Sequence, residues 1–195
     1  MLKKHSKRKS IKSKCLFSFI ILVIICSGIQ GQTKAKGKDD FPNPKGVENL
    51  LFYVQRTINT NTLIYTLNLN KNGDLDTHEP IKINWINYAK DSTIEPLNYI
   101  QRNYAYGINV QLTDKEKKIY SFNFVSYKKK SIYLIRSTAD NKYHAYFASK
   151  NGLVILERIF IQMERGSSFW TPSIKYIEVT GVNLKNEKVI EKIIP

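Results

Sequence analysis

The strongest constraint on the fold is a series of ten short apolar stretches that are separated by turn residues. Most of them have the length of a strand and are too short for a typical helix. Asn151-Gly152 lies between two of them and is a dipeptide that type I′ hairpins favour, because both central residues take positive φ. We therefore predict an all-β domain, an antiparallel β-sandwich or open barrel of about eight to ten strands. The predicted strands are Leu51–Arg56, Leu63–Asn68, Ile81–Tyr88, Gly107–Leu112, Ile119–Tyr127, Ile132–Arg136, Lys142–Ala148, Leu153–Met163, Ile174–Thr180 and Lys188–Ile194.

One segment, Glu95–Tyr104, has the pattern of a short helix. Pro96 is tolerated in a first helical turn, and Leu97, Ile100 and Tyr104 recur at helical spacing. The predicted fold is thus all-β with one short helix.

The formal charge of +15 is distributed unevenly along the chain. Seven cations lie within the first fourteen residues, whereas the sequence from Phe41 onward has 21 cations and 14 anions, a net +7. Lys128-Lys129-Lys130 is the densest basic run in this later part, and we interpret it as a solvated turn. We expect no nucleic-acid partner, and at most a weak attraction to anionic envelope surfaces.

The first thirty-one residues have the three parts of an export signal: a cationic stretch, an apolar run and small or polar residues. The twelve-residue run Cys15–Cys26 is shorter than the roughly 17 to 25 residues that span a membrane. We predict a signal peptide over residues 1–31, cleaved before Gln32, and a periplasmic or envelope-associated protein. The alternatives are an uncleaved anchor, which alone would make the protein integral to the membrane, and a lipoprotein anchored through Cys26.

The remaining chain divides into a tether and a single domain. Residues 32–46 are polar and contain Pro42 and Pro44, which is typical of a flexible tether, and we place one domain at 47–195. Both cysteines precede it, so the domain has no disulfide, no thiol catalysis and no Cys-ligated zinc.

The segment from Asn68 to Glu79 matches part of the spacing of a twelve-residue calcium loop, with a glycine at the sixth position. Several of its candidate ligands are amides, which weakens calcium binding, and the flanks read as strands. A weak calcium site and a polar hairpin built on Asn72-Gly73 are both open interpretations. The candidate metal ligands are Asn68, Asn70, Asn72, Asp76 and Glu79.

Residues for catalysis are few. After the signal segment the only histidines are His78 and His144, and there is no Gly-x-Ser-x-Gly elbow, His-Glu-x-x-His motif or phosphate-binding glycine loop. Carboxylates near aromatic residues, such as Glu157, Glu164 and Glu178, leave open a carboxylate-based hydrolase of envelope polymers or glycans. Ion pairing on a solvated strand is the simpler interpretation of those residues.

Five separated motifs together resemble the domain of unknown function 4833 family, a group of uncharacterised exported bacterial proteins. The similarity runs from about Asn43 to Pro195 and implies one secreted domain, with the motif positions as the first to test; it implies no reaction. The motifs are Leu51–Arg56, Trp85–Tyr88, Tyr99–Gly107, Phe124–Lys128 and Gly166–Pro172.

We therefore expect an exported, monomeric binding or envelope-associated domain whose partner is an envelope component, a glycan or a protein. Tyrosine and tryptophan suit such a surface, because each pairs an apolar ring with a polar group. The candidate ligand-binding residues are Trp85, Tyr88, Arg102, Tyr106 and Trp170.

Overall fold

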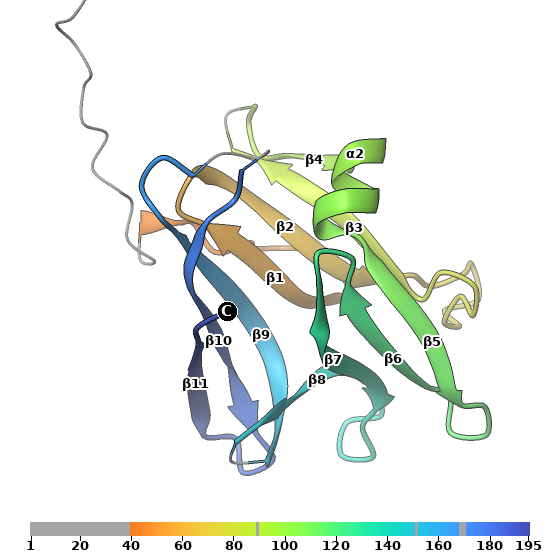
Figure 1. The fold of residues 1–195 in the computed structure, drawn as a ribbon. Coiled ribbons are helices and arrows are strands. Elements are labelled where there is room, and N and C mark those ends of the chain that lie inside the picture. Colours follow the sequence, from red (N-terminus) through yellow and green to blue (C-terminus); the bar gives the residue numbers. More distant parts are fainter. Residues whose placement is uncertain (1–39, 89, 151, 168–170) are drawn as a thin grey trace, which may run out of the picture. The chain divides into compact units, whose positions relative to one another are not determined.

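A computed structural model describes residues 40–195 except 89, 151 and 168–170 (Figure 1). These described residues form eleven strands of one sheet and two short helical turns, which confirms the all-β prediction. No helix in this part of the chain is both long and apolar enough to span a membrane. The elements are β1 (Leu50–Arg56), β2 (Asn59–Leu67), β3 (Ile81–Asn87), β4 (Thr93–Pro96), α2 (Tyr99–Gln101), η3 (Arg102–Tyr106), β5 (Ile108–Asp114), β6 (Ile119–Phe124), β7 (Tyr127–Arg136), β8 (Tyr143–Ser149), β9 (Gly152–Met163), β10 (Ile174–Asn183) and β11 (Lys188–Ile193).

Strand β9 is the branch point of the sheet. One of its edges pairs with β10 over nearly the whole strand, and β11 continues the sheet beyond β10. Its other edge is shared, because the first part pairs antiparallel with β8 and the second part pairs parallel with β1. The sheet therefore forks into a first wing, β1 to β4, and a second wing, β8 back to β5, and it curls into a half-barrel (Figure 1).

Stacked aromatic rings join the two wings. Phe52 of β1 stacks on Tyr65 of β2, with ring centroids 4.4 Å apart, and on Phe122 of β6 in the opposite wing at 6.1 Å. Phe124 meets the edges of Phe52 and Tyr65 nearly at right angles. Phe52, Tyr65 and Phe122 are fully buried, so this cluster removes a large apolar area from water and holds the wings face to face.

The segment just before β1 packs against β9 and the first wing. Phe41 is buried against Phe160, with ring centroids 5.7 Å apart. The buried side chain of Gln55 donates from Nε2 to the carbonyl oxygen of Pro42 and to Oγ1 of Thr62, both at 2.9 Å. The described end of the predicted tether thus contacts the sheet.

Each of the ten predicted strands falls on an observed strand, and β4 is an additional one. The predicted helix begins too early, because Glu95 and Pro96 belong to β4 and pair with Trp85 and Asn84 of β3. The helical turns start after Asn98, whose Oδ1 accepts a hydrogen bond from the backbone N–H of Gln101.

Glycine at position 107 is required by the end of η3. A Cβ added there would overlap the backbone carbonyl oxygen of Arg102, which cannot move without unwinding the turn. Gly107→Ala should therefore lower the free energy of unfolding by about 3 kcal/mol, the upper end for atoms added to a packed region. Urea unfolding measures the change.

Gly46→Ala is the matched control. Gly46 has φ +69° and no heavy atom within 4 Å of an added Cβ, so the substitution costs only backbone strain of about 1 kcal/mol. Equal losses in the two variants would show that the contact with Arg102 does not constrain position 107.

Candidate ligand-binding pocket

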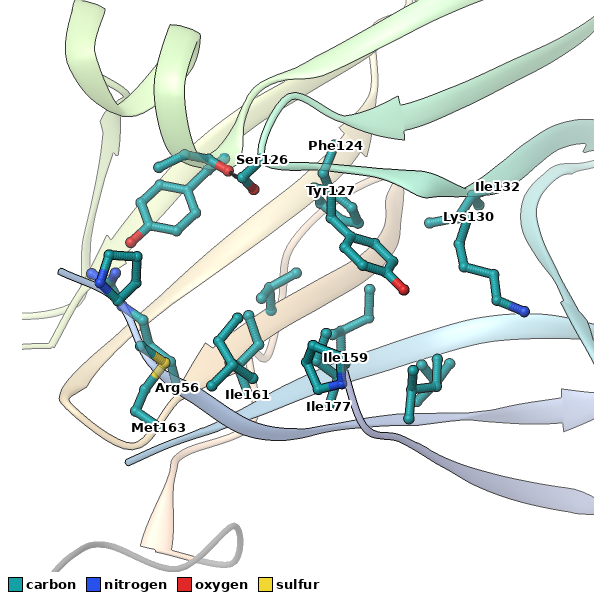
Figure 2. Close-up of a pocket in the computed structure, with 18 of the residues that line it drawn as sticks. Arg56, Phe124, Ser126, Tyr127, Lys130, Ile132, Ile159, Ile161, Met163 and Ile177 are labelled. Atoms are coloured by element: carbon teal, nitrogen blue, oxygen red, sulfur yellow. Dashed lines mark hydrogen bonds between the residues drawn. The ribbon is translucent and has the colours of Figure 1, made fainter. Parts of the chain in front are cut away.

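The half-barrel encloses a pocket of about 650 Å³, a volume in the ordinary range for small-molecule sites. Figure 2 shows Ile159, Ile161 and Ile177 on one side, facing Phe124 and Tyr127 on the other. The walls come from the first wing, the second wing, the β9–β11 layer and the helical turns. The pocket exists because the two wings diverge from β9 and leave space between their inner faces.

Strand alternation places the apolar side chains on the inner face. In β9, Ile159, Ile161 and Met163 are two residues apart and all line the pocket, as do Ile177 and Val179 in β10. Side chains with this period point to the same face of a strand. The pocket wall is therefore a direct consequence of the apolar alternation in these two strands.

Few polar groups line the pocket. Among its described lining side chains there is no Asp, Glu or His, and the charged side chains are those of Arg56 and Lys130, which lie at opposite ends in Figure 2. The hydroxyl of Ser126 is already used, because it donates to the carbonyl oxygen of Ala105 at 2.6 Å. The pocket can thus accept an apolar molecule and offers cationic groups to an anion.

Arg56 lies against two adjacent aromatic rings at the end of β1. Its guanidinium carbon lies 4.8 Å from the ring centroid of Tyr106 and 5.4 Å from that of Trp85. Its Nε is buried and has no hydrogen-bond partner among the described residues. Burial lowers the pKa of Arg56 to about 10, so the side chain is still a cation at neutral pH.

The aromatic neighbours of Arg56 are themselves fixed. Trp85 and Tyr106 meet edge to face at 5.3 Å, and Nε1 of Trp85 donates to Oε1 of Gln101 at 3.1 Å. The hydroxyl of the fully buried Tyr65 donates to the carbonyl oxygen of Tyr106 at 2.8 Å. These bonds attach the helical turns to the first wing and set the position of both rings.

The structure brings two of the five predicted ligand-binding residues together. Tyr106 lines the pocket. Trp85 does not line it but contacts Tyr106 and Arg56, which do. Tyr88 instead contacts the segment before β1, through its hydroxyl and the carbonyl oxygen of Pro42. Arg102 does not line the pocket but pairs with Glu79 at 2.9 Å, and Trp170 lies outside the described residues.

Arg56 ends the first of the five motifs but was not among the predicted ligand-binding residues. The available signal was the alternation Phe52-x-Val54-x-Arg56, which places a cation on the same strand face as two apolar residues. A charged residue in register with a buried face is unusual and marks a candidate site.

The predicted calcium loop is tied together by its own hydrogen bonds. Oδ1 of Asn70 accepts from the backbone N–H groups of Asn72 and Asp74, and Oδ1 of Asp76 accepts from those of His78 and Glu79. The Asn68 side chain donates to the carbonyl oxygen of Glu79. Among the described residues there is no group of three or more His, Cys, Asp or Glu side chains that could hold a metal ion.

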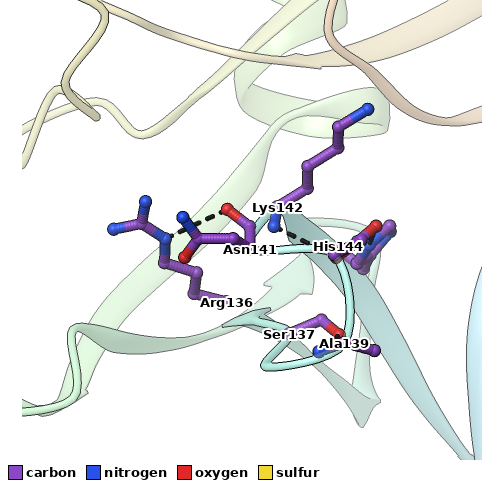
Figure 3. A network of polar contacts seen from close by, with 7 residues as sticks. Arg136, Ser137, Ala139, Asn141, Lys142 and His144 are labelled. Carbon is purple, nitrogen blue, oxygen red and sulfur yellow. Dashed lines mark hydrogen bonds and ion pairs between the residues drawn. The ribbon is translucent and has the colours of Figure 1, made fainter.

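The hairpin between β7 and β8 contains a second polar cluster (Figure 3). Nε2 of His144 lies 2.8 Å from Oδ2 of Asp140, and the backbone N–H of Lys142 donates to Oδ1 of Asp140. These contacts, that of Lys142 first, lower the pKa of Asp140. The hydroxyl oxygen of Ser137, in the same hairpin, accepts a hydrogen bond from the backbone N–H of Ala139.

The hydrogen bonds of Asp76 predict an acid-sensitive loop. The N–H groups of Glu79 and then His78 lower the pKa of Asp76, so its contribution to stability is present above about pH 3.9 and is lost as pH falls through the lower, folded value. Asp76→Ala should therefore lower stability at pH 7 and reduce the further loss on acidification. Urea midpoints at pH 7 and pH 3 measure both effects. Asp74→Ala, in the same loop, is the control and should leave the pH 7 midpoint nearly unchanged.

Calcium binding by the loop can be tested by melting. Because the carboxylates of the loop do not converge, we expect equal melting temperatures in millimolar calcium and in chelator. A melting temperature that rises with calcium, and no longer rises in Asp76→Asn, would establish the metal site.

The comparisons with known proteins add a family and no function. No curated protein and no solved structure matches the chain. The family model described as Domain of unknown function (DUF4833) matches residues 52–192, which include all of the strands from β2 to β10. The match covers most of the chain and confirms the resemblance carried by the five motifs. The chain belongs to the DUF4833 family.

Proposed function

We propose that this domain is a binding module that takes an apolar small molecule into the half-barrel pocket. The observation that carries the proposal is a 650 Å³ pocket whose lining is almost entirely aliphatic and aromatic. Apolar surface of this kind is costly to leave in contact with water, and a bound apolar molecule removes that cost. The curled sheet supplies the walls, so the site is largely formed before the ligand arrives.

Binding is favoured over hydrolysis at this site. A carboxylate-based hydrolase needs two carboxylates facing one substrate bond, one as acid and one as base or nucleophile. The described side chains that line the pocket include no carboxylate and no histidine. The hydrolase therefore has no acid–base pair in the pocket that would hold its substrate.

The proposed setting is the cell envelope. The cationic and apolar pattern of residues 1–31 supports export, and the alternative attachment is a lipid on Cys26. Apolar molecules are abundant in a cell envelope, and a carrier protein is needed to shield them from water outside the membrane. A monomeric domain with a modest positive charge suits contact with such a surface, with no role for nucleic acid.

The test is binding of the neutral fluorophore N-phenyl-1-naphthylamine to the protein as the cell produces it. Ala105 lines the pocket from η3, and Ala105→Trp should fill part of the space and weaken binding at least tenfold. Ala139→Trp introduces the same side chain at an exposed position in the β7–β8 hairpin and should leave the affinity unchanged.

Two results would overturn the proposal. One is the absence of saturable binding by the folded wild-type protein. The other is equal weakening by the two tryptophan variants, which would place the fluorophore outside the pocket.

A further inference from the structure

We propose that the ligand of the half-barrel pocket is an amphipathic anion, with its apolar tail in the pocket and its carboxylate on the guanidinium of Arg56. The inference rests on the proposed binding function and assigns the chemical class of the ligand. Its basis is the position of Arg56, a cation in the wall of an apolar pocket and beside two fixed aromatic rings.

The first step is the missing counter-charge. Buried or half-buried guanidinium groups are ordinarily paired with a carboxylate, because an unpaired charge away from water is destabilising. No ion pair of Arg56 is found among the described residues, and its Nε has no hydrogen-bond partner there. The aromatic rings offset part of this penalty but leave the buried Nε without a hydrogen bond among the described residues.

The second step is preorganisation. Trp85 and Tyr106 form two adjacent aromatic contacts with the guanidinium. A hydrogen bond to Gln101 fixes the Trp85 ring, and a hydrogen bond from Tyr65 fixes the backbone of Tyr106. A guanidinium that is already oriented loses little freedom when a ligand binds. Because Nε is enclosed, the anion would meet the two terminal nitrogens, which can bind both oxygens of one carboxylate.

Lys130 is the other cation that lines the pocket, and it fits this role less well. It is exposed, and its Nζ lies 5.8 Å from the ring of Phe147 at the far end of the site from Arg56 (Figure 2). A solvated ammonium already has water as its partner and gains less from an anion. We therefore assign the head group to Arg56.

The third step is the tail. The space beyond Arg56 is bounded by aliphatic residues of β9 and β10, which offer no hydrogen bond to a polar chain. Four lining residues, Ile58, Ile100, Tyr104 and Ile174, are also exposed and form an apolar rim. An acyl chain can pass this rim without losing a polar contact, whereas a sugar would have to shed its hydration.

The experiment compares dodecanoate with 1-dodecanol, which differ in the charge of the head group. Each compound is titrated at pH 8 as a competitor that displaces N-phenyl-1-naphthylamine from the pocket. The displacement is measured for the wild-type protein, Arg56→Met and Arg136→Met. Arg136, on β7, does not line the pocket and is the matched control. The wild-type protein should bind dodecanoate at least tenfold more tightly than dodecanol, as expected for a hydrogen bond to a charged group.

The variants locate the head group. Arg56→Met should weaken dodecanoate binding tenfold or more and dodecanol binding less than threefold, while Arg136→Met should change neither. Shortening the acid to decanoate should weaken binding by a further factor of more than ten, since each buried methylene contributes roughly a fourfold change.

Several outcomes would overturn the inference. Equal affinity of the wild-type protein for acid and alcohol would exclude a head-group site, and this comparison stands even if Arg56→Met does not fold. Loss of dodecanoate binding in Lys130→Met, with Arg56→Met unaffected, would move the head group to the other end of the pocket. If the neutral fluorophore itself does not bind, the proposed function fails, so the two failures are distinguishable.

Discussion

The structure depends on the divided edge of β9. Ile155 of this strand faces Tyr146 of β8, whereas Arg158, three residues later, faces Tyr53 of β1. One strand therefore anchors both wings. The change from an antiparallel to a parallel neighbour occurs between Ile155 and Arg158. A fork of this kind prevents the sheet from closing on itself, so its inner surface must be filled by side chains or left as a pocket.

Both solutions occur, at different places between the wings. The stacked rings of Phe52, Tyr65 and Phe122 fill the space where the wings approach each other. Farther along, aliphatic side chains such as Ile161 and Ile177 line open space. Tyr65 belongs to both regions, because its ring stacks in the core, lines the pocket and carries the hydroxyl that holds Tyr106. The core and the candidate site are thus built on common residues.

The sequence predicted what depends on local pattern. Short apolar stretches between turn residues located the ten strands, and Tyr106 and Trp85 were selected for their aromatic chemistry. The parallel β1–β9 pair was not predictable, since it joins segments a hundred residues apart and local alternation does not encode which strands are neighbours. The alternation in β1 could have marked Arg56 as a cation on an apolar face, but its aromatic neighbours on β3 and η3 are brought to it only by the fold.

Arg56 connects the stability of the domain with the ligand we infer for it. A cation without a counter-charge in an apolar wall weakens the fold, and its two aromatic neighbours offset this only in part. A ligand carboxylate would supply the missing partner and stabilise the folded state at the same time. Because Trp85 is bonded to Gln101 at the start of the helical turns, the site for the head group and the attachment of those turns share one set of contacts. Binding of the inferred head group would therefore be coupled, through Trp85 and Tyr106, to the docking of α2 and η3.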